Sequence, residues 1–179
     1  MDSDNLTSAE NQQERPGIEQ WIVGFVDGEG CFSICVVRNA GCQLGCQVQH
    51  EFSVTQAAPS RDALELIRTE FGCGTIIENR PSDNHRDHLL RFSVKRRCDL
   101  REVVIPFFRR NPLVTTKARD FELFCDALLL MEGGAHLSES GLRSIAQITE
   151  QMNRKGRSRF LESSEAKRRP PRTQPAGAK

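Results

Sequence analysis

Two acidic residues stand at the end of the most apolar stretch of this chain. In WIVGFVDGEG (21–30), six uncharged residues precede Asp27 and Glu29, and each acid is followed by a glycine. Carboxylate oxygens are ligands that Mg²⁺ prefers, and a divalent cation held this way can activate water for phosphodiester cleavage. A D-G-E-G turn that simply ends a helix would use the same residues. The pattern alone therefore leaves a metal site and a helix end as alternatives.

The apolar stretch predicts a helix, about Ile18 to Asp27, that Gly28 closes. At ~3.6 residues per turn its six apolar positions cover the whole circumference, so the helix needs burial on two sides. The protein's own sheet covers one side, and we expect a second copy to cover the other across a two-fold axis. Such symmetry would bring like carboxylates together, and a divalent cation would relieve their repulsion. The predicted dimer interface comprises Trp21, Gly24, Phe25 and Gly28.

Two predicted hairpins and a helix between them must position the carboxylates of Asp27 and Glu29. Alternating apolar and polar residues predict strands at 31–39 and 46–56, and again at 74–80 and 88–96. A helix that opens at Pro59 and Ser60 and ends at GCG (72–74) separates the two hairpins. The order α-ββ-α-ββ-α predicts an α+β fold in which helices cover one face of an antiparallel sheet.

Three further helical segments are predicted after the second hairpin. The first, 98–112, should break near Pro106 or Pro112. The second, 115–134, begins at a threonine cap and ends at paired glycines, and the third, 138–153, begins at a serine cap. We expect a disordered lead-in over 1–16, one domain over 17–154 and a basic disordered tail over 155–179.

Composition favours a polar, intracellular protein that does not enter a membrane. The 179 residues are 37% hydrophobic, and no apolar run approaches the length of a membrane span. The polar, acidic N-terminus is not a secretory or transit signal, and seven scattered cysteines indicate reduced thiols. The net charge is +1, yet residues 154–179 carry nine Lys or Arg against two Glu, and residues 80–110 carry nine against four acids. Basic clusters of this kind attract phosphates, although many are merely solvated surface.

The cysteine spacing argues against a zinc site. Cys31 and Cys35, like Cys42 and Cys46, are four residues apart in segments predicted to be strands or strand ends. Four residues along a strand span ~13 Å, too far for two ligands of one zinc ion. Buried or surface thiols are the favoured interpretation.

The order of these motifs resembles the LAGLIDADG homing endonucleases. WIVGFVDGEG is similar to the dimer-interface motif of that family, and FSVTQ (52–56), GCGTI (72–76) and IPFFRRNPLVTTKARDFELF (105–124) follow in the family's order. The resemblance covers about residues 18–130. Only one copy of the motif is present, since LLLMEGGAHLSESG lacks the acid-glycine ending. The resemblance therefore implies the homodimeric, single-motif branch.

The resemblance also implies catalytic and metal-binding roles. Glu29 matches the family's metal-binding carboxylate, and Gly28 matches a main-chain carbonyl that helps to hold the metal. Gln56 matches a residue that positions the metal-bound water, and Lys117 matches a basic residue near the scissile phosphate. Arg61 is the nearest candidate for a phosphate contact. Without the resemblance, Gln56 is an ordinary strand-end glutamine, Lys117 is a solvated lysine, and Asp27 remains a structural residue at the helix end.

Strand alternation separates a polar face that could read DNA. Glutamine can pair with adenine, and glutamate can accept from cytosine, when a curved sheet lies in a major groove. Any solvent-facing sheet alternates in this way, and the resemblance favours DNA. The predicted DNA-contacting residues are Ser33, Cys35, Val37, Asn39, Gln47, Gln49, Glu51 and Ser53 in the first hairpin, and Asn79 and Arg91 in the second.

These observations predict a site-specific endonuclease that makes double-strand breaks in long, near-palindromic DNA. The resemblance implies Mg²⁺ as cofactor, with Mn²⁺ able to replace it and Ca²⁺ non-catalytic, and a host intron or intein whose mobility the cut promotes. It further implies an intracellular location, in an organelle if the gene is organellar. One alternative is an RNA maturase that binds its host intron, and another is a DNA-binding regulator that has lost catalysis. The presence of Glu29, Gln56 and Lys117 favours the nuclease over both.

Overall fold

A four-stranded antiparallel sheet in the order β1-β2-β4-β3 forms the centre of the protein. The structure is a computed structural model that describes residues 17–79 and 88–152, so the predicted lead-in, the basic tail and the turn of the second hairpin lie outside the described residues. The strands are β1 (Gly30–Arg38), β2 (Cys46–Ala57), β3 (Thr75–Asn79) and β4 (Leu89–Val94). Both predicted hairpins are confirmed, with ends that differ by one or two residues.

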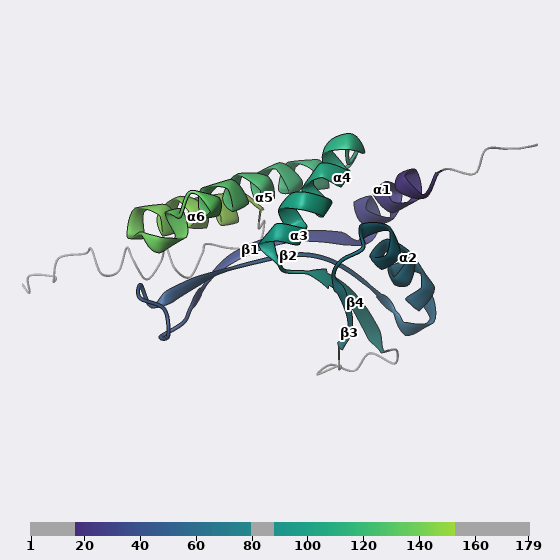
Figure 1. Ribbon diagram of the computed structural model, residues 1–179, viewed down its shortest axis with the longest axis horizontal. Helices are drawn as coiled ribbons and strands as arrows, with labels where there is room; N and C mark the ends of the chain where they lie inside the picture. The colour runs from purple at the N-terminus through teal and green to yellow at the C-terminus, as the bar shows by residue number, and fades with distance from the viewer. Residues whose placement is uncertain (1–16, 80–87, 153–179) are drawn as a thin grey trace, which may run out of the picture.

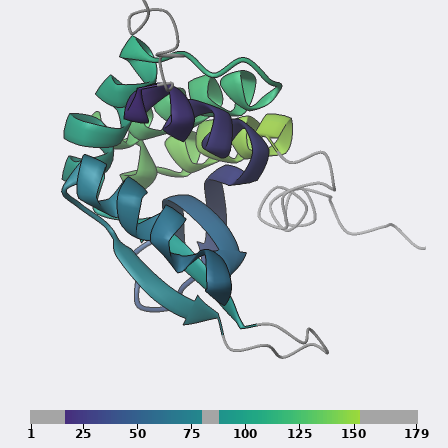
Figure 2. The same ribbon diagram turned by 90° about the vertical axis from the view of Figure 1, so that its right-hand side faces the viewer.

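The helices lie on the convex side of the arched sheet and leave its concave side open (Figure 1). Helices α1 and α2 cover one end of the sheet, as the view in Figure 2 shows, and the later helices cover the rest. The elements are α1 (Ile18–Glu29), η1 (Ala58–Ser60), α2 (Arg61–Phe71), α3 (Arg97–Asp99), η2 (Leu100–Val104), α4 (Ile105–Arg110), α5 (Lys117–Glu132), η3 (Ala135–Leu137) and α6 (Glu139–Met152). The predicted αββαββα arrangement of an α+β fold is confirmed. In the described residues, no helix is both long and apolar enough to span a bilayer.

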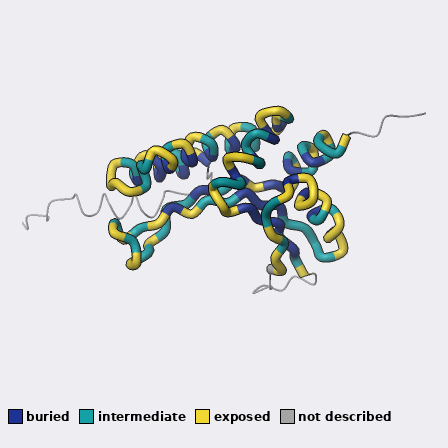
Figure 3. Tube along the Cα trace, in the orientation of Figure 1, coloured by how far each residue is buried: buried dark blue, intermediate teal, exposed yellow. Residues whose placement is uncertain are grey.

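Phenylalanine rings hold the helices to the covered face of the sheet. Phe32 of β1 packs against Phe52 of β2 with ring centroids 5.0 Å apart, and against Phe108 of α4 at 5.5 Å. It also meets Phe121 and Phe124 of α5 at 5.3 and 5.5 Å. Each of these rings is at most 5% exposed, and the buried positions in Figure 3 gather where helices and sheet meet. Ile34, Val48 and Val54, which lie an even number of residues from Phe32 or Phe52 along the same strand, are also buried. Since successive residues of a strand face opposite sides, this confirms which residues were predicted to share a face.

The end of α1 differs from the prediction by two residues. Gly28 was expected to close the helix, but α1 continues through Glu29, and the chain passes into β1 at Gly30 without a loop. The backbone N–H of Gly30 donates to the Val26 carbonyl, so the helical turn completes itself before the strand begins. A Cβ at Gly30 would lie 2.5 Å from Val26 Cγ1 and 2.7 Å from the Val26 carbonyl oxygen. Only glycine allows this direct passage from helix to strand.

The proline-containing helix breaks at the second of its two prolines. The chain is helical from α3 through η2, a π-helical turn, to the end of α4, and it leaves the helix at Asn111, immediately before Pro112. Proline disfavours the helical conformation of the residue before it. Pro106 is tolerated near the start of α4, directly after the wider π-helical turn. The predicted break near Pro106 or Pro112 is confirmed, and it falls at Pro112.

The two predicted helix caps have different outcomes. Ser138 caps α6, because its Oγ accepts a hydrogen bond from the Gly141 backbone N–H at 3.1 Å. Thr116 occupies the cap position of α5 but makes no capping bond through its side chain. Thr115 takes that role instead, and its Oγ1 accepts from the Lys117 N–H at 3.3 Å. The hydroxyl of Thr115 also donates to the Asp27 carboxylate at 2.7 Å.

We predict that Gly30→Ala lowers the free energy of unfolding by about 1–3 kcal/mol, since the new methyl group overlaps Val26. Gly133→Ala is the matched control, because its Cβ would meet nothing closer than 3.6 Å. Urea denaturation of both variants measures the difference. Equal stability of the two variants would contradict the close approach at Gly30.

Candidate active site and DNA-binding surface

Asp27 ties the end of α1 to the segment that precedes α5. Its carboxylate accepts hydrogen bonds from the backbone N–H groups of Val114 at 2.8 Å and Thr115 at 3.2 Å, and from the Thr115 hydroxyl at 2.7 Å. Burial opposes ionisation, but these bonds and the nearby Lys117 ammonium outweigh it and hold the pKa of Asp27 below its usual value. The structural role predicted for Asp27 is confirmed.

Lys117 lies at the end of α1, and its predicted role near the scissile phosphate stays a prediction. Its Nζ donates to the main-chain carbonyl oxygens of Asp27 at 2.8 Å and Gly28 at 2.7 Å. The last carbonyl groups of a helix lack partners within the helix and form the negative end of its dipole, so an ammonium group is stabilised there. Residues ninety positions apart in the sequence thus meet at one point.

Glu29 and Gly28 lie exposed beside this contact, at the junction of α1 and β1. They provide one carboxylate and one main-chain carbonyl, which are hard oxygen ligands of the type that suits Mg²⁺. The described residues contain no group of three or more His, Cys, Asp or Glu side chains that could hold a metal ion. The metal-binding role predicted for Glu29 and Gly28 stays a prediction. The Gly28 carbonyl already accepts from Lys117, so a cation there would compete with the ammonium group.

Gln56 and Arg61 lie near the start of α2 and do not contact Glu29. Gln56 is a half-buried residue of β2, opposite Leu90, and shares its parity with the buried Phe52 rather than with the open face. Arg61 begins α2 and pairs with Glu65 at 3.3 Å, with 54% of its side chain exposed. In the described parts of the chain, neither residue bonds to Glu29 or Lys117. Their predicted catalytic roles stay predictions.

The predicted DNA-contacting residues of the first hairpin share the open, concave face of the sheet. In the register of β1 and β2, Ser33 lies opposite Glu51, Cys35 opposite Gln49, and Val37 opposite Gln47. Asn39 follows β1, and its Nδ2 donates to Gln47 Oε1 at 2.9 Å. Gln47 and Gln49 are exposed, and a weak contact of 3.8 Å joins Cys35 Sγ to Gln49 Oε1. Apart from Val37, these residues form a polar surface along the hairpin.

The second hairpin extends this surface. Arg91 of β4 lies opposite Thr55 of β2 and Ile77 of β3. The backbone of Asn79 ends β3, opposite Leu89. Its strand position agrees with the prediction, and its role as a DNA contact stays a prediction.

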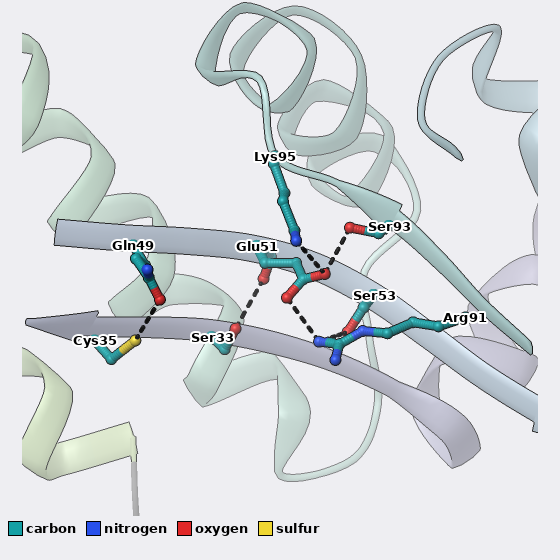
Figure 4. A network of polar contacts seen from close by, with 8 residues as sticks. All are labelled: Ser33, Cys35, Gln49, Glu51, Ser53, Arg91, Ser93 and Lys95. Atoms are coloured by element: carbon teal, nitrogen blue, oxygen red, sulfur yellow. Dashed lines mark hydrogen bonds and ion pairs between the residues drawn. The ribbon is translucent and has the colours of Figure 1, made fainter. Parts of the chain in front are cut away.

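A polar network occupies the centre of the open face (Figure 4). Glu51 lies between Arg91, whose Nη2 donates at 2.7 Å, and Ser93, whose Oγ donates at 2.5 Å, with Lys95 Nζ at 3.8 Å. Arg91 Nη2 also donates to Ser53 Oγ at 3.1 Å. Ser53 is 2% exposed, so in this conformation it offers almost no surface to a base. Ser53 was predicted to contact DNA; in this structure its hydroxyl accepts from Arg91 instead of facing solvent.

Sequence reasoning missed several residues that contribute to these sites. Ser93 and Lys95 alternate with Arg91 along the second hairpin, so strand parity could have placed them on the open face. Val114 and Thr115 hold Asp27, and no sequence signal links them to a carboxylate 87 and 88 residues earlier.

We predict that Asp27→Asn lowers the free energy of unfolding by about 1 kcal/mol at neutral pH, because hydrogen bonds to a carboxylate are lost at a partly exposed site. The folded-state pKa of Asp27 is lowered, so its stabilisation is present above the usual pKa and is lost as pH falls through the folded pKa. The stabilities of parent and variant should therefore begin to converge as the pH falls below about 4, and should meet below the lowered folded pKa of Asp27. Asp126→Asn, at an exposed position of α5, is the control. A difference that persists unchanged at pH 2 would contradict this role.

Comparison with known proteins places this arrangement in one family. Residues 22–128 match the family model described as LAGLIDADG endonuclease. The chain is 34% identical to "Probable intron-encoded endonuclease 3" of Neurospora crassa over 138 residues, which are 76% of this chain and 25% of that protein. It is 30% identical to "Homing endonuclease I-ApeII" of Aeropyrum pernix, with 64% of each chain covered. The chain thus spans about a quarter of the fungal relative and under two thirds of the archaeal one.

Solved structures share this fold, and the match covers nearly all of one such chain and about half of another. The crystal structure of the homing endonuclease I-TnaI has a TM-score of 0.72 and 36% identity, and the match covers 83% of this chain and 96% of that chain. The LAGLIDADG homing endonuclease I-LtrWI, bound to its target DNA, has a TM-score of 0.74 and 33% identity, and the match covers 82% of this chain and 48% of that chain. This chain therefore corresponds to one whole I-TnaI chain or to half of I-LtrWI, which agrees with the single motif in its sequence. The chain belongs to the LAGLIDADG endonuclease family.

Proposed function

We propose that this protein is a homing endonuclease that cuts both strands of a long, near-palindromic DNA site and so promotes the mobility of its host intron or intein. The observation that carries the proposal is the position of Glu29, exposed at the α1–β1 junction beside Lys117 and next to an open polar sheet face. The relatives named as intron-encoded or homing endonucleases support this activity, as does the similarity to I-LtrWI bound to its target. An intracellular location follows from the same proposal.

A second copy of the chain is the proposed partner of α1. Ile22 and Val26 are buried in the protein's own core, whereas Gly24 and Gly28 are exposed and Trp21 and Phe25 are half-buried on the same side of the helix as these glycines. A Cβ at Gly24 or Gly28 would meet no atom within 4 Å. Trp21 and Phe25 stack at 4.9 Å on the same face. This apolar face with two glycines, at one end of the molecule (Figure 2), suits close helix packing across a two-fold axis.

Such a dimer would complete the metal site. Each chain contributes the carboxylate of Glu29 and the carbonyl of Gly28, and two chains double this oxygen set around the axis. A bound divalent cation supplies activation of water and stabilisation of the leaving oxygen. Lys117 is close enough to place a positive charge beside the same point. We propose Mg²⁺ as the physiological ion, with Mn²⁺ as a substitute and Ca²⁺ non-catalytic.

The concave sheet face is the proposed DNA-binding surface. Its polar residues come from adjacent strands in fixed register, and a curved sheet of this kind suits a major groove. The two copies of a dimer would present the face twice, which matches a near-palindromic target.

We predict that Glu29→Gln separates binding from cleavage. The substitution keeps size and polarity but removes the charge that would hold the metal, so cleavage should fall at least about a hundredfold. Affinity for DNA should persist, because it rests on the sheet and on basic groups that remain. The assays are plasmid nicking and linearisation in Mg²⁺ and a gel shift in Ca²⁺, both on the joined sequences that flank the gene.

The control is Glu19→Gln, the same change in the first turn of α1. It should leave cleavage near the parent rate. A Glu29→Gln protein that linearises DNA as fast as the parent would remove Glu29 from the site. A parent that never cuts but binds its host intron RNA tightly would instead support the maturase alternative.

We predict that Gly24→Leu weakens dimerisation at least about tenfold and lowers cleavage with it, because the added side chain forces the two helices apart. Thr69→Leu, which adds a leucine at an exposed position of α2, is the control and should leave the dimer intact. Sedimentation equilibrium at micromolar concentration measures both variants beside the parent. A parent protein that sediments as a monomer would refute the proposed interface.

A further inference from the structure

Glu51 has its two carboxylate oxygens committed within the protein. Arg91 donates to Oε2 at 2.7 Å, and Ser93 donates to Oε1 at 2.5 Å, with Lys95 Nζ 3.8 Å from the same oxygen. The Glu51 side chain is only 15% exposed. Each oxygen can accept a further hydrogen bond, but the bound donors and the small exposed fraction leave a cytosine amino group little room to reach either oxygen. Glu51 is therefore badly placed for the cytosine contact that its residue type predicts.

The guanidinium of Arg91 is held through one of its two terminal nitrogens, Nη2. Both hydrogens of Nη2 are used, since this atom donates to Glu51 and to Ser53 Oγ at 3.1 Å. Its Nε is buried and unpaired in the described structure, whereas Nη1 bonds to no residue that the structure describes. The Arg91 side chain is 30% exposed, and Figure 4 shows its guanidinium held between Glu51 and Ser53. Apart from the buried Nε, the guanidinium thus has one donor group, Nη1, without a partner among the described residues, and that group is held in a fixed position.

We propose that Arg91 selects guanine at one base pair in each half of the DNA target, and that Glu51 is the residue that positions Arg91. This inference rests on the proposed function and adds which base one part of the sheet selects. Arginine has only donors, and guanine places two acceptors, O6 and N7, side by side in the major groove. A donor held in place before binding loses less side-chain freedom on contact.

The charges around Glu51 support this assignment. A free carboxylate on a DNA-facing surface would repel phosphates. Here Arg91 and the 64%-exposed Lys95 lie against Glu51, so two cations surround one anion. The network therefore keeps a net positive charge toward DNA while it fixes the guanidinium.

The test is selection of binding sites from a randomised duplex DNA library in Ca²⁺, with parent, Glu51→Gln and Arg91→Gln proteins. The parent should enrich a near-palindrome with guanine at one position in each half. Arg91→Gln should replace that guanine by adenine, because a glutamine amide pairs with adenine. Glu51→Gln should weaken the guanine preference about tenfold at the same position, since the guanidinium loses its anchor.

Two further variants separate positioning from general stability. Ser93→Ala keeps the charges of Glu51 and Arg91 and removes only the hydroxyl donor to Glu51. It should therefore weaken the same guanine preference less than Glu51→Gln does. Gln49→Ala, on the same strand but outside the Arg91 contact, should change a different position. Thermal melting of every variant accompanies the selection, and loss of preference at all positions together would overturn the proposal in favour of a merely structural role.

The other possible outcomes of the selection also support or contradict the proposal. If Glu51→Gln converts a cytosine preference into adenine at a position of its own and leaves the guanine intact, Glu51 reads DNA independently and the inference is wrong. If the parent enriches no sequence, the proposed function itself fails. If Glu51→Gln and Arg91→Gln change the same position in each half, the positioning role stands.

Discussion

The junction of α1 and β1 is the constraint on which the remaining geometry depends. The chain turns from helix to strand without a loop, because Gly30 lets the strand start directly against Val26. Asp27 then binds the segment before α5, and Lys117 caps the last carbonyl groups of α1. These contacts fix where Glu29 lies relative to the helices and the sheet.

The sheet links this junction to the surface proposed for DNA. β1 begins at Gly30, so its register with β2 is set from the same point that positions Glu29. Each open-face residue of the first hairpin then has a defined distance along the strands from the proposed cutting site. Phenylalanine packing on the covered face holds the arch against α4 and α5. A change in that packing would alter both the curvature of the sheet and the position of Lys117.

The sequence predicted what depends on local pattern and missed what depends on distant contacts. Alternation in 31–39 and 46–56 was enough to place Phe32 and Phe52 in the core and Gln47 and Gln49 on the open face. Parity could not reveal that Glu51 is bound by Arg91, Ser93 and Lys95, because those contacts join residues 40 to 44 positions apart. The end of α1 was misjudged because Gly28 appears as a helix terminator in sequence, whereas Gly30 performs that role through a close approach to Val26. The contact of Lys117 with α1 joins residues about ninety positions apart, and no local pattern predicts it.

The central claim is that two chains share one cutting site, each through its own Glu29. The direct measurement is the rate of strand breakage in target DNA, counted as nicked plus linear product, by dimers assembled from known mixtures of parent and Glu29→Gln chains, co-refolded so that chains pair at random. If both chains of a dimer must carry Glu29, activity follows the square of the parent fraction, and an equal mixture keeps about a quarter of the parent rate. Activity that falls in direct proportion, with about half remaining in the equal mixture, would mean that each chain cuts alone and would contradict the shared site.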